Sequence, residues 1–382
     1  MRNRTANSLQ GDGGRVRCSS ALKLGGWSGS MDVSKELLMT TYDPDTDLRL
    51  DPRVRAILKM MPTGPGPTYA TRDEVLEAAR SPEALASAEA TRQLVELCDT
   101  EDVVTSRGLE LWAEKVESQP DGNIIHLQIV RPAGDAVLPC VYYIHGGGMA
   151  SLSCTMGNYR AWAKILAHHG VCVVMVEFRN SMQPSSVEDI APFPGGLNDC
   201  VSGLRWVHAH ARDLRIDPAR VVVSGESGGG NLAIAVGLQL KHDGALDLVK
   251  GIYALCPFIA GEYPRQELPS TSENNGIFIN LVGNGPAMAY GIEHLTNRNP
   301  VAWPYWASIE ELAGFPTTVI SVNECDPLRD EGIAFYRKLV EAGVNARCRN
   351  VLGTMHATEL IPIVCPEITA DAAAHLAAFA TA

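Results

Sequence analysis

One serine of the chain stands where its neighbours make it a candidate nucleophile. Ser227 is the centre of the pentapeptide G-E-S-G-G at 225–229, which follows directly on the apolar run 220–224. An apolar strand that breaks into G-x-S-x-G and then into a helical pattern predicts a nucleophile elbow. The glycines permit so tight a turn, and the turn lifts the serine hydroxyl to where a base can reach it. The pentapeptide also occurs by chance in glycine-rich chains, so other motifs in the sequence are needed to show whether Ser227 is a nucleophile.

A second glycine motif could stabilise negative charge on a substrate. The sequence H-G-G-G at 145–148 follows the apolar run 141–144. Successive glycines let backbone N–H groups approach a substrate with no side chain in the way, which an oxyanion hole requires. The predicted donors are the N–H groups of Gly147, Gly148 and Gly228, supported by His145 and Gly146. A phosphate-binding glycine loop is the alternative, weakened because no G-K-[ST] or G-x-G-x-x-G follows.

An acid that could complete this chemistry follows a later strand. A serine hydroxyl is a poor nucleophile until a base takes its proton, and that base needs an acid to orient it. In the chain order Ser, acid, His, Asp326 comes just after the apolar run 317–322 and is the predicted acid. Glu324 and Asp330 are its rivals, but Glu324 lies nearer the strand and we expect Asp330 to cap the next helix.

His356 is the predicted base, because it lies in a loop after the last predicted strand, with Gly353 and Thr354 making the bend. If His356 is the base, activity should fall as the pH drops through about 6 to 7. A structural role is expected for the histidines that fall in helical patterns or in an early strand, which are His126, His168, His169, His208 and His210.

The elements that would position these residues alternate along the chain. Apolar and β-branched runs predict strands at 109–116, 124–130, 137–144, 171–178, 220–224, 249–256, 317–322 and 346–351. Helical spacing predicts helices at 159–169, 196–210, 228–241 and 331–342. This alternation implies an α/β fold with a mostly parallel eight-stranded sheet flanked by helices. The first strands, joined without helices, imply an antiparallel edge.

The remaining regions are assigned to a cap and a lead. Residues 31–100 carry helical patterns with a proline-rich break at 62–67. The aromatic-rich segment 258–308 is too long for a simple connection, so we expect it and the N-terminal helices to form a helical cap. A peripheral insertion is the alternative for 258–308. The catalytic core would comprise 101–257 and 309–382. Residues 1–30 lack the apolar core of a signal peptide and are expected to be a disordered lead or an added remnant.

Composition narrows the class of protein. Of 382 residues, 46% are hydrophobic and 20% charged, as in ordinary globular proteins, and a net charge of −12 argues against nucleic acid or an anionic membrane as partner. No stretch has the length of a transmembrane helix. The ten cysteines show no metal-ligand spacing, so we expect no metal and a reduced, cytoplasmic setting. Cys325, beside the predicted acid, is a packed cysteine or, less favoured, a reactive thiol.

Together these motifs resemble those of the hormone-sensitive lipase-like family of α/β-hydrolase carboxylesterases. The resemblance rests on H-G-G-G at 145–148, G-E-S-G-G at 225–229, D-P-L-R-D-E-G at 326–332 and the turn 353–356, and it covers the chain from about Val103 onward. It implies an α/β-hydrolase fold with a cap and a Ser–His–Asp triad. It also implies hydrolysis of short- to medium-chain carboxylic esters without a cofactor.

The chain departs from the pattern of this family near both glycine motifs. Many relatives have Asp before the nucleophile and Ala after it, where this chain has Glu226 and Gly228. Many also have an aromatic residue at the position of Met149. We expect Glu226 to brace the oxyanion loop or a cap residue. Because these changes could reshape the acyl pocket, the chain-length preference of the family does not transfer.

Other functions stay open beside ester hydrolysis. The same residues could hydrolyse lactones, thioesters or amides, since the chemistry is shared. A non-catalytic, ligand-binding relative is less favoured, because all three triad residues are present. An oxidoreductase lacks a dinucleotide fingerprint. The expected partner is a small-molecule ester, without nucleic acid or integral membrane association, and a homodimer is left open.

Overall fold

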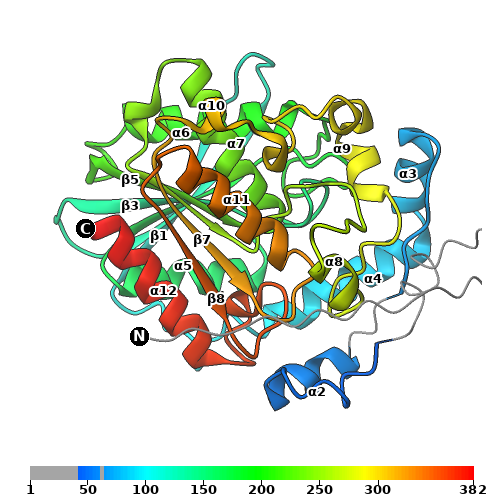
Figure 1. The fold of residues 1–382 in the computed structure, drawn as a ribbon. Coiled ribbons are helices and arrows are strands. Elements are labelled where there is room, and N and C mark those ends of the chain that lie inside the picture. The colour runs from blue at the N-terminus through cyan, green and yellow to red at the C-terminus, as the bar shows by residue number, and fades with distance from the viewer. Residues whose placement is uncertain (1–41, 61–63) are drawn as a thin grey trace, which may run out of the picture.

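An eight-stranded sheet forms the centre of the molecule (Figure 1). The computed structural model describes residues 42–60 and 64–382, so the predicted lead over 1–30 and the start of the predicted cap lie outside the described residues. The strands are β1 (Leu109–Glu117), β2 (Ile124–Pro132), β3 (Leu138–Ile144), β4 (Cys172–Glu177), β5 (Ile216–Glu226), β6 (Gly251–Leu255), β7 (Thr317–Asn323) and β8 (Ala346–Val351). Their spatial order is β1-β2-β4-β3-β5-β6-β7-β8.

The direction of the strands follows the sequence-based expectation. β2 pairs antiparallel with both β1 and β4, and every other pair of neighbours in the sheet is parallel. One face is covered by α6 (Gly195–Ala209), α7 (Gly228–His242) and α11 (Arg329–Glu341), and the other by α5 (Gly157–His168) and α12 (Pro366–Thr381). The predicted α/β fold with an antiparallel edge is therefore confirmed.

Burial on both faces explains the composition of the central strands. All six residues of β4, C-V-V-M-V-E, are buried. A strand covered by helices on both sides reads as a continuous apolar run rather than an alternating one. The neighbouring β3 carries Tyr142 and Tyr143 side by side in the chain, and they enter the cores on opposite faces of the sheet. Successive side chains of a strand point to opposite faces, so one pair of tyrosines serves both layers.

Among the strands and the helices that cover the sheet, two differ from the prediction by more than two residues. β5 begins at Ile216 rather than at 220, because Ile216 pairs with Leu138 of β3 across a shift in register. The helix α12 has no counterpart in the sequence analysis. It is rich in alanine, a strong helix former. Most of its buried residues are small, however, so the sequence shows little difference in hydrophobicity between the buried and the exposed side of the helix. Its buried residues are Thr369, Ala372, Ala373, Leu376, Ala377, Phe379 and Ala380.

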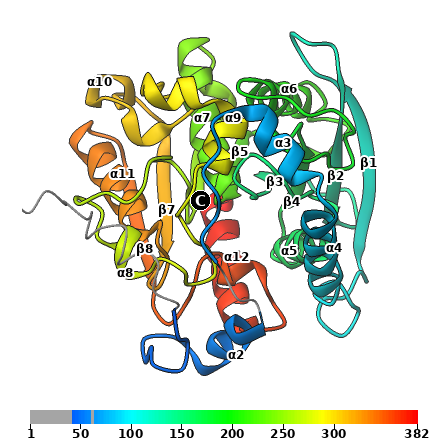
Figure 2. The ribbon, with the colours of Figure 1, turned by 90° about the vertical axis from the view of Figure 1, so that its right-hand side faces the viewer.

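Elements from two distant parts of the chain gather at one end of the sheet (Figure 2). They are α2 (Pro52–Met60), α3 (Arg72–Ala79) and α4 (Pro82–Glu96) from the N-terminal part, and α8 (Ser270–Glu273) and α9 (Gly285–Thr296) from the predicted insertion. Val75 of α3 packs against Met288 and Ala289 of α9, so the two parts contact each other. Their separation from the core as a cap remains a prediction.

Short helical segments complete the described part of the chain, and none of its helices is both long and apolar enough to span a bilayer. These segments are η1 (Leu246–Leu248), η2 (Pro304–Trp306), α10 (Ile309–Leu312) and η3 (Thr358–Leu360).

Candidate active site

Ser227 lies in a sharp turn between β5 and α7. Its backbone has φ 56° and ψ −120°, a conformation that residues with a side chain rarely adopt. The flanking glycines are required by close approach of the backbone. A Cβ on Gly229 would lie 2.0 Å from the carbonyl oxygen of Ile144, and one on Gly225 would lie 2.4 Å from that of Gly229. The turn thus has the geometry that the G-x-S-x-G motif predicts.

His356 and Asp326 form a buried pair. The His356 Nδ1 atom is 2.7 Å from Asp326 Oδ2, and the two side chains are 5% and 0% exposed. Burial opposes charge on the imidazole, but the Asp326 carboxylate outweighs burial and raises the pKa of His356 well above its usual range. Asp326 Oδ1 accepts a hydrogen bond from the backbone N–H of Leu328 at 2.8 Å. The carboxylate is therefore fixed at both oxygens.

The rival acids of the sequence analysis have other partners. Glu324 Oε2 accepts from the backbone N–H of Gly353 at 2.9 Å. Asp330 Oδ2 accepts from the backbone N–H of Ser270 at 2.7 Å. The expectation that Asp330 caps the following helix is wrong, because α11 has Leu328 as its N-cap and no side-chain cap bond. Asp330 instead joins this helix to the insertion.

One cavity of about 430 Å³ brings the predicted residues together. Ser227, His356, Gly147, Gly148 and Glu226 all line it. None of the five other histidines named in the sequence analysis lines this cavity. Residues far apart in the chain thus meet at one surface, at the carboxyl ends of β3, β5, β7 and β8.

The oxyanion loop lies against the start of α7. Gly147 and Gly148 have φ angles of 93° and 63°, which favour glycine. A Cβ on Gly228 would lie 2.7 Å from the backbone nitrogen of Gly148 and 2.5 Å from that of Met149, so the two backbones touch. The side chain of Met149 is buried in the core and does not line the cavity. Met149 therefore does not form part of the wall of this cavity.

Glu226 links this loop to the sheet. Its Oε1 atom accepts from the backbone N–H of Gly146 at 2.7 Å and from the Tyr159 hydroxyl at 2.5 Å, and its Oε2 atom accepts from the Tyr143 hydroxyl at 2.7 Å. Burial raises the pKa of Glu226 to about 7. Glu226 was expected to contact the oxyanion loop or a cap residue, and in the structure it contacts the oxyanion loop. The sequence analysis did not find the two tyrosines, because no motif marks them.

His145 opens the oxyanion loop and is buried. Its ring stacks on Phe178 with 4.3 Å between the centroids, and its Nδ1 atom lies 3.0 Å from the carbonyl oxygen of Gly146. Burial lowers the pKa of His145, which keeps the ring neutral. The neutral ring, stacked on Phe178, therefore supports the oxyanion loop from within the core.

A second buried glutamate holds the loop on the other side of the nucleophile. Glu331 Oε1 accepts from the backbone N–H groups of Ile259 at 2.6 Å and Ala260 at 3.4 Å. Its Oε2 atom accepts from the Tyr263 hydroxyl at 2.7 Å. Burial raises the pKa of Glu331 to about 8. Glu331 lies in the D-P-L-R-D-E-G motif, but its partners could not be read from the sequence.

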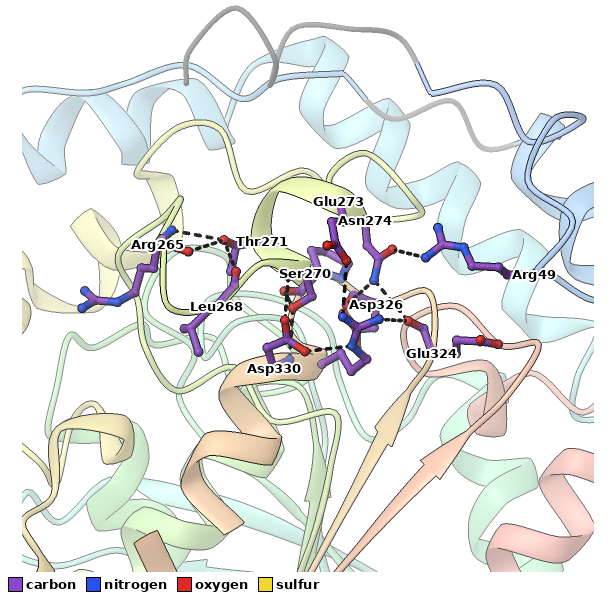
Figure 3. A network of polar contacts seen from close by, with 12 residues as sticks. Arg49, Arg265, Leu268, Ser270, Thr271, Glu273, Asn274, Glu324, Asp326 and Asp330 are labelled. Atoms are coloured by element: carbon purple, nitrogen blue, oxygen red, sulfur yellow. Dashed lines mark hydrogen bonds and ion pairs between the residues drawn. The ribbon is translucent and has the colours of Figure 1, made fainter. Parts of the chain in front are cut away.

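Residues of the insertion fix the acid loop (Figure 3). The buried Asn274 donates through Nδ2 to the backbone carbonyls of Glu324 and Asp326, both at 3.1 Å. Its Oδ1 atom accepts from Arg49 Nη1 at 3.0 Å. The position of Asp326 thus depends on a side chain 52 residues earlier, which the sequence analysis missed. No local signal could have found it.

Ser270 adds a second contact of the same kind (Figure 3). Its Oγ atom accepts from the backbone N–H of Asp330 at 3.0 Å and donates to the carbonyl of Pro327 at 2.9 Å. Together with the bond from Ser270 N to Asp330, this ties the start of α8 to the start of α11. The acid loop is therefore held at both of its ends.

Two cysteines lie next to the buried pair. Among the described residues, one group of metal-ligating side chains comes close together, Cys256, Asp326 and His356, with ligand atoms within 4.8 Å of one another. His356 and Asp326 are already bonded to each other, and burial raises the pKa of Cys256 to about 11, so this thiol stays neutral. Burial likewise raises the pKa of Cys325 to about 12. Cys325 is fully buried, which agrees with the favoured packed role.

The aromatic residues of 258–308 divide between cavity wall and core. Phe258 and Phe278 line the cavity. Tyr290 and Trp303 are buried in the core cluster that contains α7. The segment therefore contributes to the site with a few side chains, while its largest ones support the scaffold.

Comparison with known proteins agrees with this geometry. A family model described as alpha/beta hydrolase fold matches residues 141–360. The solved structure of esterase Est22 has a TM-score of 0.86 and 53% identity, covering 88% of this chain and 99% of Est22. Brefeldin A esterase, described as a bacterial homologue of human hormone sensitive lipase, has a TM-score of 0.80 and 38% identity over 91% of this chain and 96% of its own. Esterase LipI of Mycobacterium tuberculosis is 28% identical over 260 residues, which are 62% of this chain and 75% of LipI.

The chain belongs to the α/β-hydrolase fold family. Within it, the resemblance to hormone-sensitive lipase-like esterases is confirmed, as is the prediction of a hydrolase.

Proposed function

We propose that the protein is a serine carboxylesterase that uses Ser227, His356 and Asp326 as its triad. The observation that carries this proposal is the buried His356–Asp326 pair, which shares one cavity with Ser227 and the glycine loop. A hydroxyl on a strained turn, a base held by a carboxylate and a loop of bare N–H groups suit acyl transfer. The esterase names of the relatives support the same reaction.

The proposed reaction runs through an acyl-enzyme. His356 takes the proton as the Ser227 hydroxyl oxygen attacks the ester carbonyl, and Asp326 stabilises the resulting imidazolium. The N–H groups of Gly147, Gly148 and Gly228 stabilise the oxyanion. The alcohol leaves with the proton from His356. Water then attacks the acyl carbonyl as His356 takes its proton, and the bond to Ser227 breaks as His356 returns that proton to the serine oxygen, which frees the acid.

The cavity supports short- to medium-chain esters as substrates. Its volume is about 430 Å³, and most of its walls are apolar. The apolar residues come from α2, α4, the insertion and the segment that follows His356, and they include Ile57, Leu94, Val95, Phe278, Leu281, Ile361 and Ile363. An apolar chain of moderate length can be buried there, which favours binding in proportion to the area removed from water.

Replacement of the nucleophile tests the proposal. Ser227→Ala should lower kcat on p-nitrophenyl butyrate by a factor of about 10⁴ or more. Ser224→Ala is the matched control, because Ser224 is a buried serine in the strand that precedes the turn, and its hydroxyl has no hydrogen-bond partner among the described residues. An unchanged rate in Ser227→Ala would exclude the triad. Labelling of Ser227 by a fluorophosphonate without ester turnover would instead favour hydrolysis of lactones, thioesters or amides.

We also propose a cytoplasmic protein, because the nine cysteines within the described residues form no disulfide. The homodimer left open by the sequence is tested directly by light scattering of the purified chain.

A further inference from the structure

A second cavity lies next to the one that holds Ser227. Its volume is about 330 Å³, and its walls are largely apolar, with side chains that include Val75, Ala79, Met182 and Ala287. Four residues line both this cavity and the cavity of Ser227, namely Phe258, Asn280, Leu281 and Pro286. Because the same residues face both cavities, the two cavities are neighbours that share one thin wall.

Three of the four wall residues have roles that fix them in place. The Phe258 ring stacks on Tyr263, with 5.9 Å between the centroids, and meets the ring of Trp303 edge-on at 5.5 Å. Asn280 Oδ1 accepts a backbone N–H at 2.9 Å within its own turn. Pro286 lies in the first turn of α9, where its ring fixes the backbone. These three side chains therefore support the fold as well as the wall.

Leu281, the fourth wall residue, is held by its backbone rather than by its side chain. Its N–H donates to Asn275 Oδ1 at 2.7 Å. The carbonyl of the next residue, Val282, accepts from the backbone N–H of Gly66 at 3.0 Å. The aliphatic side chain is only half-buried. A change of this side chain should therefore alter the wall while the loop that carries it stays in place.

We propose that Leu281 sets the length of the hydrocarbon chain that an ester can place in the Ser227 cavity. This inference rests on the proposed esterase function and narrows its substrate class. A chain that reaches Leu281 meets a closed wall, and forcing extra methylene groups against a packed wall is unfavourable. A smaller residue opens the second cavity to the chain, where each further methylene group removed from water favours binding. The wall acts alike on an acyl chain and on an alcohol chain, and the experiment separates the two.

The test compares kcat/KM along two series of esters. The acyl series runs from p-nitrophenyl butyrate to p-nitrophenyl dodecanoate, and the alcohol series runs from butyl butyrate to dodecyl butyrate. In one series, the kcat/KM of the wild type should fall beyond a certain chain length. Leu281→Ala should raise kcat/KM for the first ester past that limit about tenfold relative to the shortest ester, the effect of two more buried methylene groups. Leu281→Phe should move the limit to shorter chains.

The matched control is Leu295→Ala. Leu295 is a half-buried leucine of α9 that packs against the same core cluster as Leu281 but lines neither cavity. Its length profile should equal that of the wild type. If Leu281→Ala does not fold, Leu281→Val replaces it with a smaller change in the same direction.

Three results would overturn the inference. They are a wild type whose kcat/KM does not fall with length in either series, an unchanged limit in the folded Leu281 variants, and an equal shift in Leu295→Ala. Failure of the esterase function would look different, because the wild type would then turn over no ester of either series. The series in which the limit moves identifies the part of the ester that meets Leu281.

Discussion

The two sides of the active site are held in place by different means. On the oxyanion side, Glu226 connects two glycine motifs, and its backbone partner Gly146 belongs to the H-G-G-G sequence itself. On the acid–base side, the loop of Asp326 is fixed by Asn274 and Ser270, which lie in an insertion with no motif. On the oxyanion side, the anchoring Glu226 and its partner Gly146 both belong to the glycine motifs themselves. The second side depends on side chains that only the tertiary fold brings near.

The buried glutamates show what the two sides share. Glu226 and Glu331 each accept a backbone N–H and a tyrosine hydroxyl, and burial raises the pKa of both. Each therefore fixes a loop next to Ser227 without a cation as partner. A carboxyl group buried in this way gives directional contacts, while its ionisation in the folded state is unfavourable. The two glutamates therefore hold their loops in place but lower the stability of the folded state near neutral pH, where their ionisation is favoured in the unfolded chain.

The largest effect is expected on the acid–base side, from Asp326→Asn. An asparagine cannot hold His356 in the required tautomer, so kcat should fall by about 10⁴. The pH profile gives a second measurement. Because Asp326 raises the pKa of His356 well above its usual range, wild-type activity should begin to fall at a pH above the window of 6 to 7 expected from the sequence. Asp326→Asn removes the carboxylate that raises the pKa of His356 while burial still lowers it, so the residual activity should persist to lower pH.

The neighbouring aspartate provides the control for this prediction. Asp330→Asn removes a carboxylate that contacts Ser270 and Arg329 but not His356. Its pH profile should follow the wild type. A shift of equal size in both variants would mean that general charge, rather than the contact to His356, sets the acid limb.

On the oxyanion side, Glu226→Leu should lower kcat about 10²-fold, because the loop donors lose their anchor. Glu226→Gln tests stability separately. The folded pKa of about 7 lies above the ordinary 4.5. The stability that protonated Glu226 contributes is thus complete below pH 4.5 and is lost as the pH rises through about 7. The Tm of Glu226→Gln minus that of the wild type should increase between pH 5 and pH 8 in thermal unfolding. A constant difference would contradict the buried ionisation.

The smallest effect is expected for the long-range anchor Asn274. Asn274→Ala removes the donors to the Glu324 and Asp326 carbonyls and should lower kcat by about tenfold or less, with KM nearly unchanged. Glu273→Ala is the control, since its exposed side chain makes a single 3.5 Å contact to Arg329. If Asn274→Ala lowers kcat as much as Asp326→Asn does, the acid loop has no other support. If its kcat equals that of Glu273→Ala, the long-range contacts of Asn274 do not hold the acid loop in place.

How far the sequence predicts this molecule depends on the range of each interaction. Ser227, Asp326 and His356 could be placed because each follows a strand that apolar runs reveal. Ser270 and Asn274 could not, since their contacts to the acid loop depend on elements that meet only in the folded chain. The helix α12 was missed for a different reason, because small buried alanines give no strong periodic contrast. Local patterns thus predict the scaffold and the proposed reacting groups, whereas the contacts that orient these groups could not be predicted from the sequence.

The backbone of Ser227 sets limits on how this protein can change. A residue with a Cβ held at φ 56° and ψ −120° costs on the order of 1–3 kcal/mol, which glycine would largely avoid. Selection for thermal stability alone would therefore drive this position towards Gly and away from catalysis. A relative with glycine here would be expected to be both sturdier and inert. Drift at this position is a route by which a family of enzymes can produce binding proteins, with no other part of the scaffold altered.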